Sequence, residues 1–217
     1  MTTILYHGTN KTRGNRMLIN KEQIISRGDG HWLGDGLYMF PDFVYVYKWI
    51  VDMYNSRHNP GEKSPLPEYN RLIDNYMILQ FTVTLNANRL FDLTKPEFKI
   101  LFDFTLKEMK DKGKIPDREM PEGVVLNYMF EELSYDDRYD AIKAMFTMYK
   151  NQYKFKARLN YMPQVQICIR NWDIVKTIEE YNFEDKVEKY NNMIGNLYYD
   201  DTISEASMTY KYNFRRI

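Results

Sequence analysis

Three short segments, far apart in the chain, combine small residues with polar and aromatic side chains that binding and catalysis use. The first is Tyr6-His7-Gly8-Thr9. Its imidazole supplies a hydrogen-bond donor and an acceptor, which suits a diol, and its glycine leaves the backbone open to close approach. The second is Gly34-Asp35-Gly36-Leu37-Tyr38, and the third is Gln164-Val165-Gln166-Ile167-Cys168-Ile169. Each stands where we expect a strand to begin or end, and sites on mixed sheets tend to form at such ends.

The composition bounds the class of protein. A chain of 217 residues is expected to form one domain over residues 1–217, with its core in residues 1–180 and a tail in residues 181–217. Its formal net charge is zero, which excludes a strong overall attraction to nucleic acid or to an anionic membrane. Charged residues make up 28% of the chain and aromatic residues 16%, a balance typical of a packed soluble protein.

The sequence predicts neither a disulfide framework nor a metal site. Cys168 is the single cysteine, which indicates a reducing compartment, and the three histidines stand at scattered positions. The first residues lack the pattern of a secretory signal, and no apolar run approaches the roughly 20 residues that span a bilayer. We therefore expect a cytoplasmic protein that binds no metal and has no membrane partner.

The hydrophobic pattern predicts a mixture of short strands and helices. Strands are expected at residues 3–6, 37–40, 79–85, 90–93 and 165–169. Helices are expected at residues 17–25, 42–54, 98–109, 124–133 and 140–149, followed by an acidic helical segment at 173–188. Loops are expected at residues 28–36 and 55–67. Because strands and helices do not alternate regularly, the expected fold class is α+β with a mixed sheet, and not a doubly wound parallel sheet.

One helix also carries terminal signals. Thr94 and Glu97 have the spacing of a capping box, which predicts that the helix begins after Thr94, and Gly113 is expected to end it. Its expected buried face consists of Phe98, Leu101, Phe102, Leu106 and Met109.

Taken together and in this order, the three segments resemble the signature of ADP-ribosyltransferases of the diphtheria-toxin and poly(ADP-ribose) polymerase type. That signature is His-Gly-Ser/Thr on the first strand, Gly-x-Gly-x-Tyr before a helix with a second aromatic, and a late strand with a glutamate or a substitute. Trp49 lies eleven residues after Tyr38, at the spacing of the second aromatic. Gln166-Ile167-Cys168-Ile169 resembles a small bacterial branch that has Gln-x-x-Ile in place of the glutamate. The resemblance covers spaced motifs from Leu5 to Asn171.

The resemblance implies a split antiparallel sheet with surrounding helices, and NAD+ as the substrate. It assigns His7 to the adenosine ribose, the Gly8 backbone to the nicotinamide carboxamide, and Thr9 to the same turn. Arg13 would reach the pyrophosphate, where guanidinium contacts are favoured.

It further assigns Tyr38 to one face of the nicotinamide ring, with Trp49 or Tyr47 on the other. Gln166, with Gln164 as the alternative, would bond the nicotinamide ribose. The catalytic residues are then His7, Tyr38 and Gln166. Because glutamine carries no charge, transfer of one ADP-ribose is expected in place of polymer synthesis.

The acceptor remains open between a protein and a nucleic acid. Lys150, Lys154, Lys156 and Arg158 are interleaved with aromatic residues, a pattern that suits RNA or DNA. By analogy, a small stand-alone enzyme of this kind resembles a bacterial toxin or a phage-defence effector, with an antitoxin as a further partner. Alternative functions are NAD glycohydrolysis and a catalytically silent module that binds NAD or another nucleotide.

Ordinary structural explanations also exist for each candidate residue. The histidine can cap a strand end, the glycines can serve turns, and aromatic residues on a helix usually form core. Arg13 can be a solvated loop residue, and Gln166 can be an exposed residue of its strand.

Overall fold

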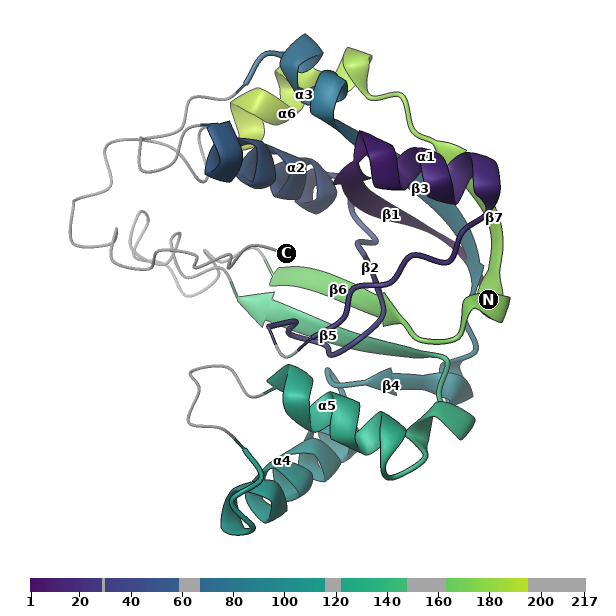
Figure 1. The fold of residues 1–217 in the computed structure, drawn as a ribbon, viewed down its shortest axis with the longest axis vertical. Coiled ribbons are helices and arrows are strands. Elements are labelled where there is room, and N and C mark those ends of the chain that lie inside the picture. The colour runs from purple at the N-terminus through teal and green to yellow at the C-terminus, as the bar shows by residue number, and fades with distance from the viewer. Residues whose placement is uncertain (29, 59–66, 116–121, 148–162, 195–217) are drawn as a thin grey trace, which may run out of the picture.

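The protein has an α+β fold built on two sheets (Figure 1). The computed structural model describes residues 1–28, 30–58, 67–115, 122–147 and 163–194. The strands are β1 (Thr2–Asn10), β2 (Leu37–Met39), β3 (Tyr76–Thr84), β4 (Leu90–Asp92), β5 (Ala141–Thr147), β6 (Pro163–Ile169) and β7 (Val175–Glu180). The α-helices are α1 (Lys11–Asn20), α2 (Phe43–His58), α3 (Tyr69–Asn75), α4 (Pro96–Asp111), α5 (Glu122–Glu131) and α6 (Val187–Ile194).

The two sheets are stacked between helices. One sheet has the order β1-β3-β7 and is antiparallel; the other has the order β2-β6-β5-β4, in which only β4 and β5 run parallel. In Figure 1, α2, α3 and α6 cover the upper sheet, and α4 and α5 cover the lower one. None of the helices in the described ranges is long and apolar enough to cross a membrane.

Alternation along β3 shows how the layers are held together. Ile78 faces the core under α2, whereas Leu79 and Phe81 face the core between the two sheets. A third core, which includes Phe91 and Leu126, lies between the lower sheet and helices α4 and α5. Strand side chains point alternately to opposite faces, so one strand contributes to two cores.

The two sheets meet where β1 approaches the end of β2. The backbones of Tyr6 and Phe40 exchange two hydrogen bonds of 2.8 Å. At the other end of β2, Ser26 and Gly36 exchange hydrogen bonds of 2.8 and 3.0 Å. The middle of β2, with Tyr38, therefore has β6 on one side and an edge turned toward β1 on the other.

Most of the expected elements are confirmed to within a few residues. They include the strands at residues 37–40, 79–85, 90–93 and 165–169, the helices at 42–54, 98–109 and 124–133, and the loop at 28–36 as far as it is described. The first strand is longer than expected, since β1 runs from Thr2 to Asn10. Helix α2 continues to His58, so residues 55–58 are not part of a loop.

Two segments that were predicted to be helical form strands, because each pairs with neighbouring strands of a sheet. Residues 140–149 were expected to be helical, but β5 lies between β4 and β6 with Ile142 fully buried. A short apolar run of this kind does not distinguish a central strand from a helix. The segment after Trp172 forms strand β7, in which Ile178 pairs with Phe81 of β3, before helix α6 begins at Val187.

Two predictions of helix ends were also wrong. Helix α1 begins at Lys11, not at residue 17, because the side chain of Asn10 caps it by accepting a hydrogen bond from the Arg13 N–H. Thr94 forms no capping box, since its N–H and hydroxyl both donate to the Asp92 carboxylate, at 3.0 and 2.6 Å. On α4, Leu101 is 41% exposed and does not belong to the buried face.

Candidate functional site

The imidazole of His7 bridges the edges of the two sheets. His7 lies on β1, and its Nδ1 is 2.7 Å from the backbone carbonyl oxygen of Tyr38 on β2. A carbonyl only accepts hydrogen bonds, so Nδ1 carries the proton and donates. The other ring nitrogen, Nε2, is thereby left as an acceptor.

The environment keeps this imidazole neutral. Burial lowers the pKa of His7 to about 4, and the positive charge of Arg13 acts in the same direction, against the hydrogen bond to Tyr38. At neutral pH His7 is therefore an uncharged group with one acceptor to offer. The expectation of a free donor and a free acceptor is corrected, because the donor is used on the backbone of β2.

Gly8 turns its backbone polar groups toward the same gap. The N–H and C=O of Tyr6 pair with Phe40, away from β3, and in a strand those of Gly8 point the same way. Across the sheet, Ile78 is opposite Gly8 and accepts from Tyr181 on its other side. The N–H and C=O of Gly8 therefore lie on the open edge of β1 that faces β2.

The opposite side of Gly8 is filled by helix α2. A Cβ on this residue would lie 2.8 Å from Trp49, 2.9 Å from Ile50 and 3.1 Å from Val46. Glycine is thus required here for close packing of strand on helix. Trp49 packs against β1 in this way, and within the described residues its ring does not contact that of Tyr38, so the structure does not bring the two expected walls together. Tyr47 is fully buried and donates its hydroxyl to Asn191, which makes it a core residue.

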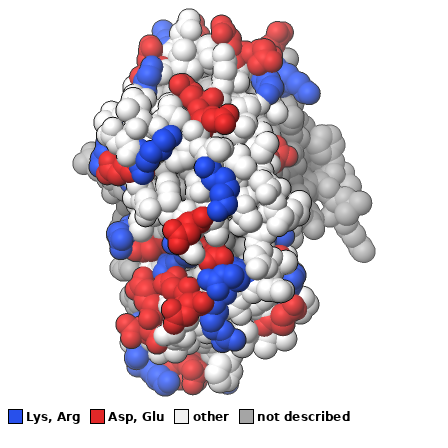
Figure 2. Space-filling view, turned by 90° about the vertical axis from the view of Figure 1, so that its right-hand side faces the viewer, with Lys and Arg blue, Asp and Glu red and all other residues white. Residues whose placement is uncertain are grey.

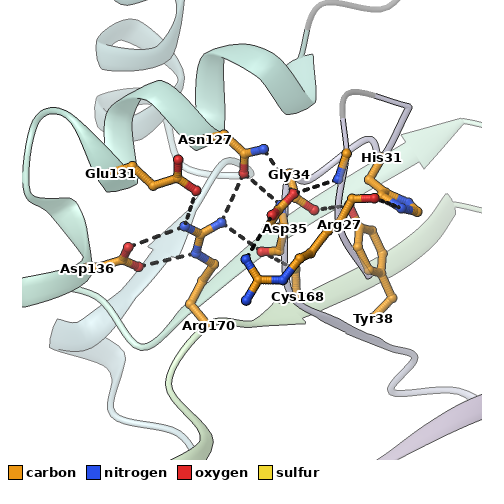
Figure 3. A network of polar contacts seen from close by, with 11 residues as sticks. Arg27, His31, Gly34, Asp35, Tyr38, Asn127, Glu131, Asp136, Cys168 and Arg170 are labelled. Atoms are coloured by element: carbon orange, nitrogen blue, oxygen red, sulfur yellow. Dashed lines mark hydrogen bonds and ion pairs between the residues drawn. The ribbon is translucent and has the colours of Figure 1, made fainter. Parts of the chain in front are cut away.

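The phenol of Tyr38 is held by the glycine loop that precedes it. Its hydroxyl donates to the carbonyl of Gly34 at 2.7 Å (Figure 3). The same hydroxyl accepts from the N–H of Leu33 at 2.8 Å. The ring of His31 lies 5.6 Å away between centroids. Burial raises the pKa of Tyr38, so the phenol stays protonated, and the residue as a whole is half-buried.

A set of polar groups from α5 and the end of β6 fixes that loop (Figure 3). The Asn127 Oδ1 accepts from the Asp35 N–H at 2.7 Å, and its Nδ2 donates to the Asp35 carboxylate at 3.1 Å. The same carboxylate accepts from the Gly28 N–H at 2.9 Å and lies 3.8 Å from Arg27. Asp35 is therefore a structural acid of the loop and not a free general base.

Arg170 completes this arrangement. Its side chain is 7% exposed and donates to the Asp35 carbonyl at 2.7 Å and to Asn127 Oδ1 at 3.0 Å. Its other nitrogens contact Asp136 at 3.2 and 3.3 Å, and its guanidinium lies 4.9 Å from the Phe130 ring centroid. Sequence reasoning missed Asn127 and Arg170, because no motif spacing connects them to the loop.

Gln164 and Gln166 lie on the face of β6 that carries Cys168. Tyr38 pairs directly with Cys168, so Gln166 is its diagonal neighbour, a separation that long side chains span. The two glutamines are 8% and 7% exposed, which contradicts the alternative of an exposed strand residue. Neither carboxamide has a hydrogen-bond partner within the described part of the chain.

Arg13 borders a polar pocket at the mouth between α1 and β6. The pocket has a volume of about 440 Å³, and its lining includes Arg13, Arg16, Arg27 and Trp172. Arg16 pairs with Glu22, and Arg27 with Asp35, whereas Arg13 has no carboxylate partner among the described residues. Burial is the main cause of the lowered pKa of both His31 and His7, and the positive charge of Arg13 lowers both pKa values further.

Thr9 has a packing role. It is 5% exposed, and its methyl group would be 3.0 Å from a Cβ added to Gly14 of helix α1. Its expected place beside a ligand is not supported by any polar contact of the described residues.

Comparison with known proteins gives one relative over most of the chain. The protein is 34% identical over 205 residues to Uncharacterized protein MJ0359 of Methanocaldococcus jannaschii, an alignment that covers 86% of this chain and 90% of the relative. The chain belongs to the family of this archaeal protein. No family model matches the chain, and no solved structure matches it.

Within the described ranges, no three His, Cys, Asp or Glu side chains are placed to hold a metal ion. The basic residues Lys150, Lys154, Lys156 and Arg158 lie outside the described residues. Cys168 is free and fully buried, and burial raises the pKa of its thiol to about 12.

Proposed function

We propose that the protein is a mono-ADP-ribosyltransferase that transfers ADP-ribose from NAD+ to a macromolecular acceptor. The observation that carries the proposal is the contact between neutral His7 and the backbone of Tyr38, at the point where the edges of the two sheets diverge. The edge of Gly8, which pairs with no other residue in the described ranges, faces the same gap. Two sheets that are joined by backbone hydrogen bonds at their edge strands β1 and β2 also support the split-sheet architecture of ADP-ribosyltransferases.

The groups that His7, Gly8 and Tyr38 present match the parts of NAD+. A carboxamide has one carbonyl and one amino group, which complement the N–H and C=O that Gly8 presents. The pyridinium ring is a flat cation, for which the partly exposed ring of Tyr38 offers an attractive face. The acceptor nitrogen of His7 suits a ribose hydroxyl.

The positive charge of Arg13 suits the diphosphate. It lacks an acidic partner among the described residues, lines the polar pocket, and helps to lower the pKa of His7. Guanidinium groups bind phosphate oxygens with two parallel hydrogen bonds, so the free cation at this position favours an anionic ligand.

The proposed reaction is a substitution at C1′ of the nicotinamide ribose. The glycosidic bond breaks with its electron pair leaving on nicotinamide, and the ribose acquires oxocarbenium character. Gln166 accepts a hydrogen bond from a ribose hydroxyl, an acceptor lone pair forms the new bond to C1′, and the acceptor's proton leaves to solvent. Gln166 orients the sugar without the charge stabilisation that a carboxylate supplies, so we expect one transfer and no chain elongation.

The test is incubation with NAD+ labelled in its adenylate half, together with cell lysate, with and without nuclease and protease. We expect label on a macromolecule and release of nicotinamide in equal amount. Replacement of His7 or Tyr38 by Ala should abolish labelling. An exposed substitution, Lys99→Ala, serves as the matched control, since Lys99 pairs with exposed Asp103 and lies over the Phe102 ring of the same helix, and it contacts none of the candidate residues.

A second candidate is a silent module that binds NAD+. It is favoured by one observation, the neutral carboxamide of Gln166 in place of an acid. Protection by NAD+ against thermal unfolding without nicotinamide release would establish it. Release of free ADP-ribose with no labelled macromolecule would instead establish a glycohydrolase.

The proposed cellular setting is that of a toxin or phage-defence effector. Induced expression of the wild-type chain should then arrest growth, and His7→Ala should not. An antitoxin would be found as a protein whose co-expression restores growth. Equal growth with both forms would remove this setting without bearing on the chemistry.

A further inference from the structure

The outer face of helix α4 carries three exposed apolar side chains. Ile100 is 66% exposed, Leu101 41% and Phe104 63%. On the inner face of the same helix, Phe102 and Met109 are buried in the core that α4 shares with α5. The helix therefore packs on its own domain with one face and presents a second apolar face to solvent. Exposed apolar side chains that cluster on one element mark a surface for interaction.

The exposed residues of this face form a row with the spacing of a helix-pairing interface. The row consists of Glu97, Ile100, Phe104 and Lys107, separated by steps of three, four and three residues. Residues at this spacing lie one above the other along one face of a helix and form the contact line of paired helices. All four are exposed. The apolar residues stand in the middle of the row, with an acid at one end and a base at the other.

The row is complementary to itself when two copies of the helix run antiparallel. With the two-fold axis at the height of Phe102, Ile100 lies opposite Phe104 of the second copy. Glu97 then lies opposite Lys107 of the second copy, because this pair is centred on the same residue. Every contact of a two-fold interface occurs twice. Two apolar layers therefore fill the middle, and one ion pair closes each end.

The two charges at the ends of the row are available for such pairs. Within the described ranges, neither Glu97 nor Lys107 forms an ion pair, whereas Lys99 pairs with Asp103 on the same helix. Charged residues at the contacts of paired helices set the orientation and the choice of partner. An acid in line with the apolar residues also disfavours an anionic membrane as the occupant of this face.

We infer that the protein forms a two-fold dimer through antiparallel pairing of α4 with α4 of a second copy. In Figure 1, α4 lies at the lower end of the molecule, away from β1 and β2, so two copies meet end to end and leave the candidate site open. The formal net charge is zero, and the side shown in Figure 2 has both signs of charge interspersed. No field of like charge therefore holds two copies apart.

The experiment measures the association of the full chain by analytical ultracentrifugation over a range of concentrations, with small-angle X-ray scattering for the shape. We expect a reversible dimer that is elongated along the long axis of the monomer. Phe104→Ser should raise the dissociation constant by about tenfold or more, because it removes an apolar contact from both middle layers. Its circular dichroism spectrum and melting temperature should stay close to those of wild type, since Phe104 is exposed in the monomer.

Reversal of the end charges tests the register of the pairing. Glu97→Lys and Lys107→Glu each set like charges opposite one another, and each should weaken the dimer by about tenfold. The double variant E97K/K107E should dimerise as wild type does. An equimolar mixture of the two single variants should form a heterodimer, because both of its ends then pair opposite charges. Lys189→Glu is the matched control, since Lys189 is exposed on α6 at the upper end of Figure 1.

A protein that stays monomeric at every concentration would overturn the inference. A dimer that tolerates Phe104→Ser and both single charge reversals would overturn it as well, because the interface would then lie elsewhere. If the mixture of single variants associates no better than either variant alone, the antiparallel pairing is wrong. Binding of the monomer to lipid vesicles that is lost with Phe104→Ser would assign the face to a membrane and overturn the dimer.

Discussion

The ring of His7 and the backbone carbonyl of Tyr38 are joined by a 2.7 Å hydrogen bond across the edges of two different sheets. The two residues are 31 positions apart in the chain. Because the bond uses Nδ1, the imidazole has a defined tautomer and a defined orientation before any ligand arrives. Loss of the ring should therefore affect both the joint between the sheets and the candidate site.

The free energy of unfolding should fall as the pH is lowered through the titration of His7. Its pKa is lowered to about 4 from 6.5, so between these values the unfolded chain binds a proton that the folded chain does not. The contribution of neutral His7 to the free energy of unfolding is thus fully present above pH 6.5 and is lost progressively toward pH 4. This loss amounts to up to about 3 kcal/mol.

Urea unfolding at several pH values checks this for wild type and for His7→Gln. The pKa of His31 is also lowered, chiefly by burial, and other groups titrate too, so the difference between the two proteins isolates His7. A difference that stays constant from neutral to acidic pH would contradict the prediction.

Gly8→Ala should destabilise the protein because its Cβ would meet helix α2. The nearest atoms, in Trp49 and Ile50, would lie 2.8 and 2.9 Å away, and overpacking of this kind costs about 1–3 kcal/mol. Gly30→Ala is the matched control, since nothing lies within 4 Å of its added Cβ. Equal melting temperatures for the two variants would show that α2 moves away without cost.

Arg170→Lys should loosen the loop that holds Tyr38. Lysine keeps the charge but cannot bond Asp35, Asn127 and Asp136 together, as the planar fork does. We expect a loss of about 1–3 kcal/mol and a weaker near-ultraviolet circular dichroism signal from tyrosine. The exposed pair Lys99–Asp103 offers a comparison, in which Lys99→Ala should change stability by no more than about 0.5 kcal/mol. An Arg170→Lys protein with wild-type stability and spectrum would show that the fork is not needed.

The thiol of Cys168 should be inert in the native protein. It is fully buried, and burial raises its pKa to about 12, so neither access nor a thiolate favours reaction. A coloured disulfide reagent should titrate one thiol in denaturant and almost none in buffer over the same time. Rapid reaction in buffer would mean that the strand pair of Tyr38 and Cys168 opens frequently.

The strands that alternate clearly were predictable from their residues alone. Leu79, Phe81 and Val83 are all fully buried, as their alternation with polar residues indicates. The helix predicted from residue 140 was wrong because the apolar residues there fit either a helix or a strand. These residues form strand β5 because they pair with β4 and β6, which are separate segments of the chain.

The residues of the candidate site were likewise predictable from the sequence only in part. The types and order of His7, Tyr38 and Gln166 indicate three strand ends, because residue type and local alternation are properties of neighbouring residues. Asn127 and Arg170 could not be found in this way, because they contact the loop at Asp35 but lie 92 and 135 positions from it in the sequence. Sequence by itself thus determined which groups are available and on which strands they lie. Only the tertiary structure decided that Trp49 packs behind Gly8, that His7 donates to Tyr38 and that Gln164 is buried, because each depends on contacts between separate elements.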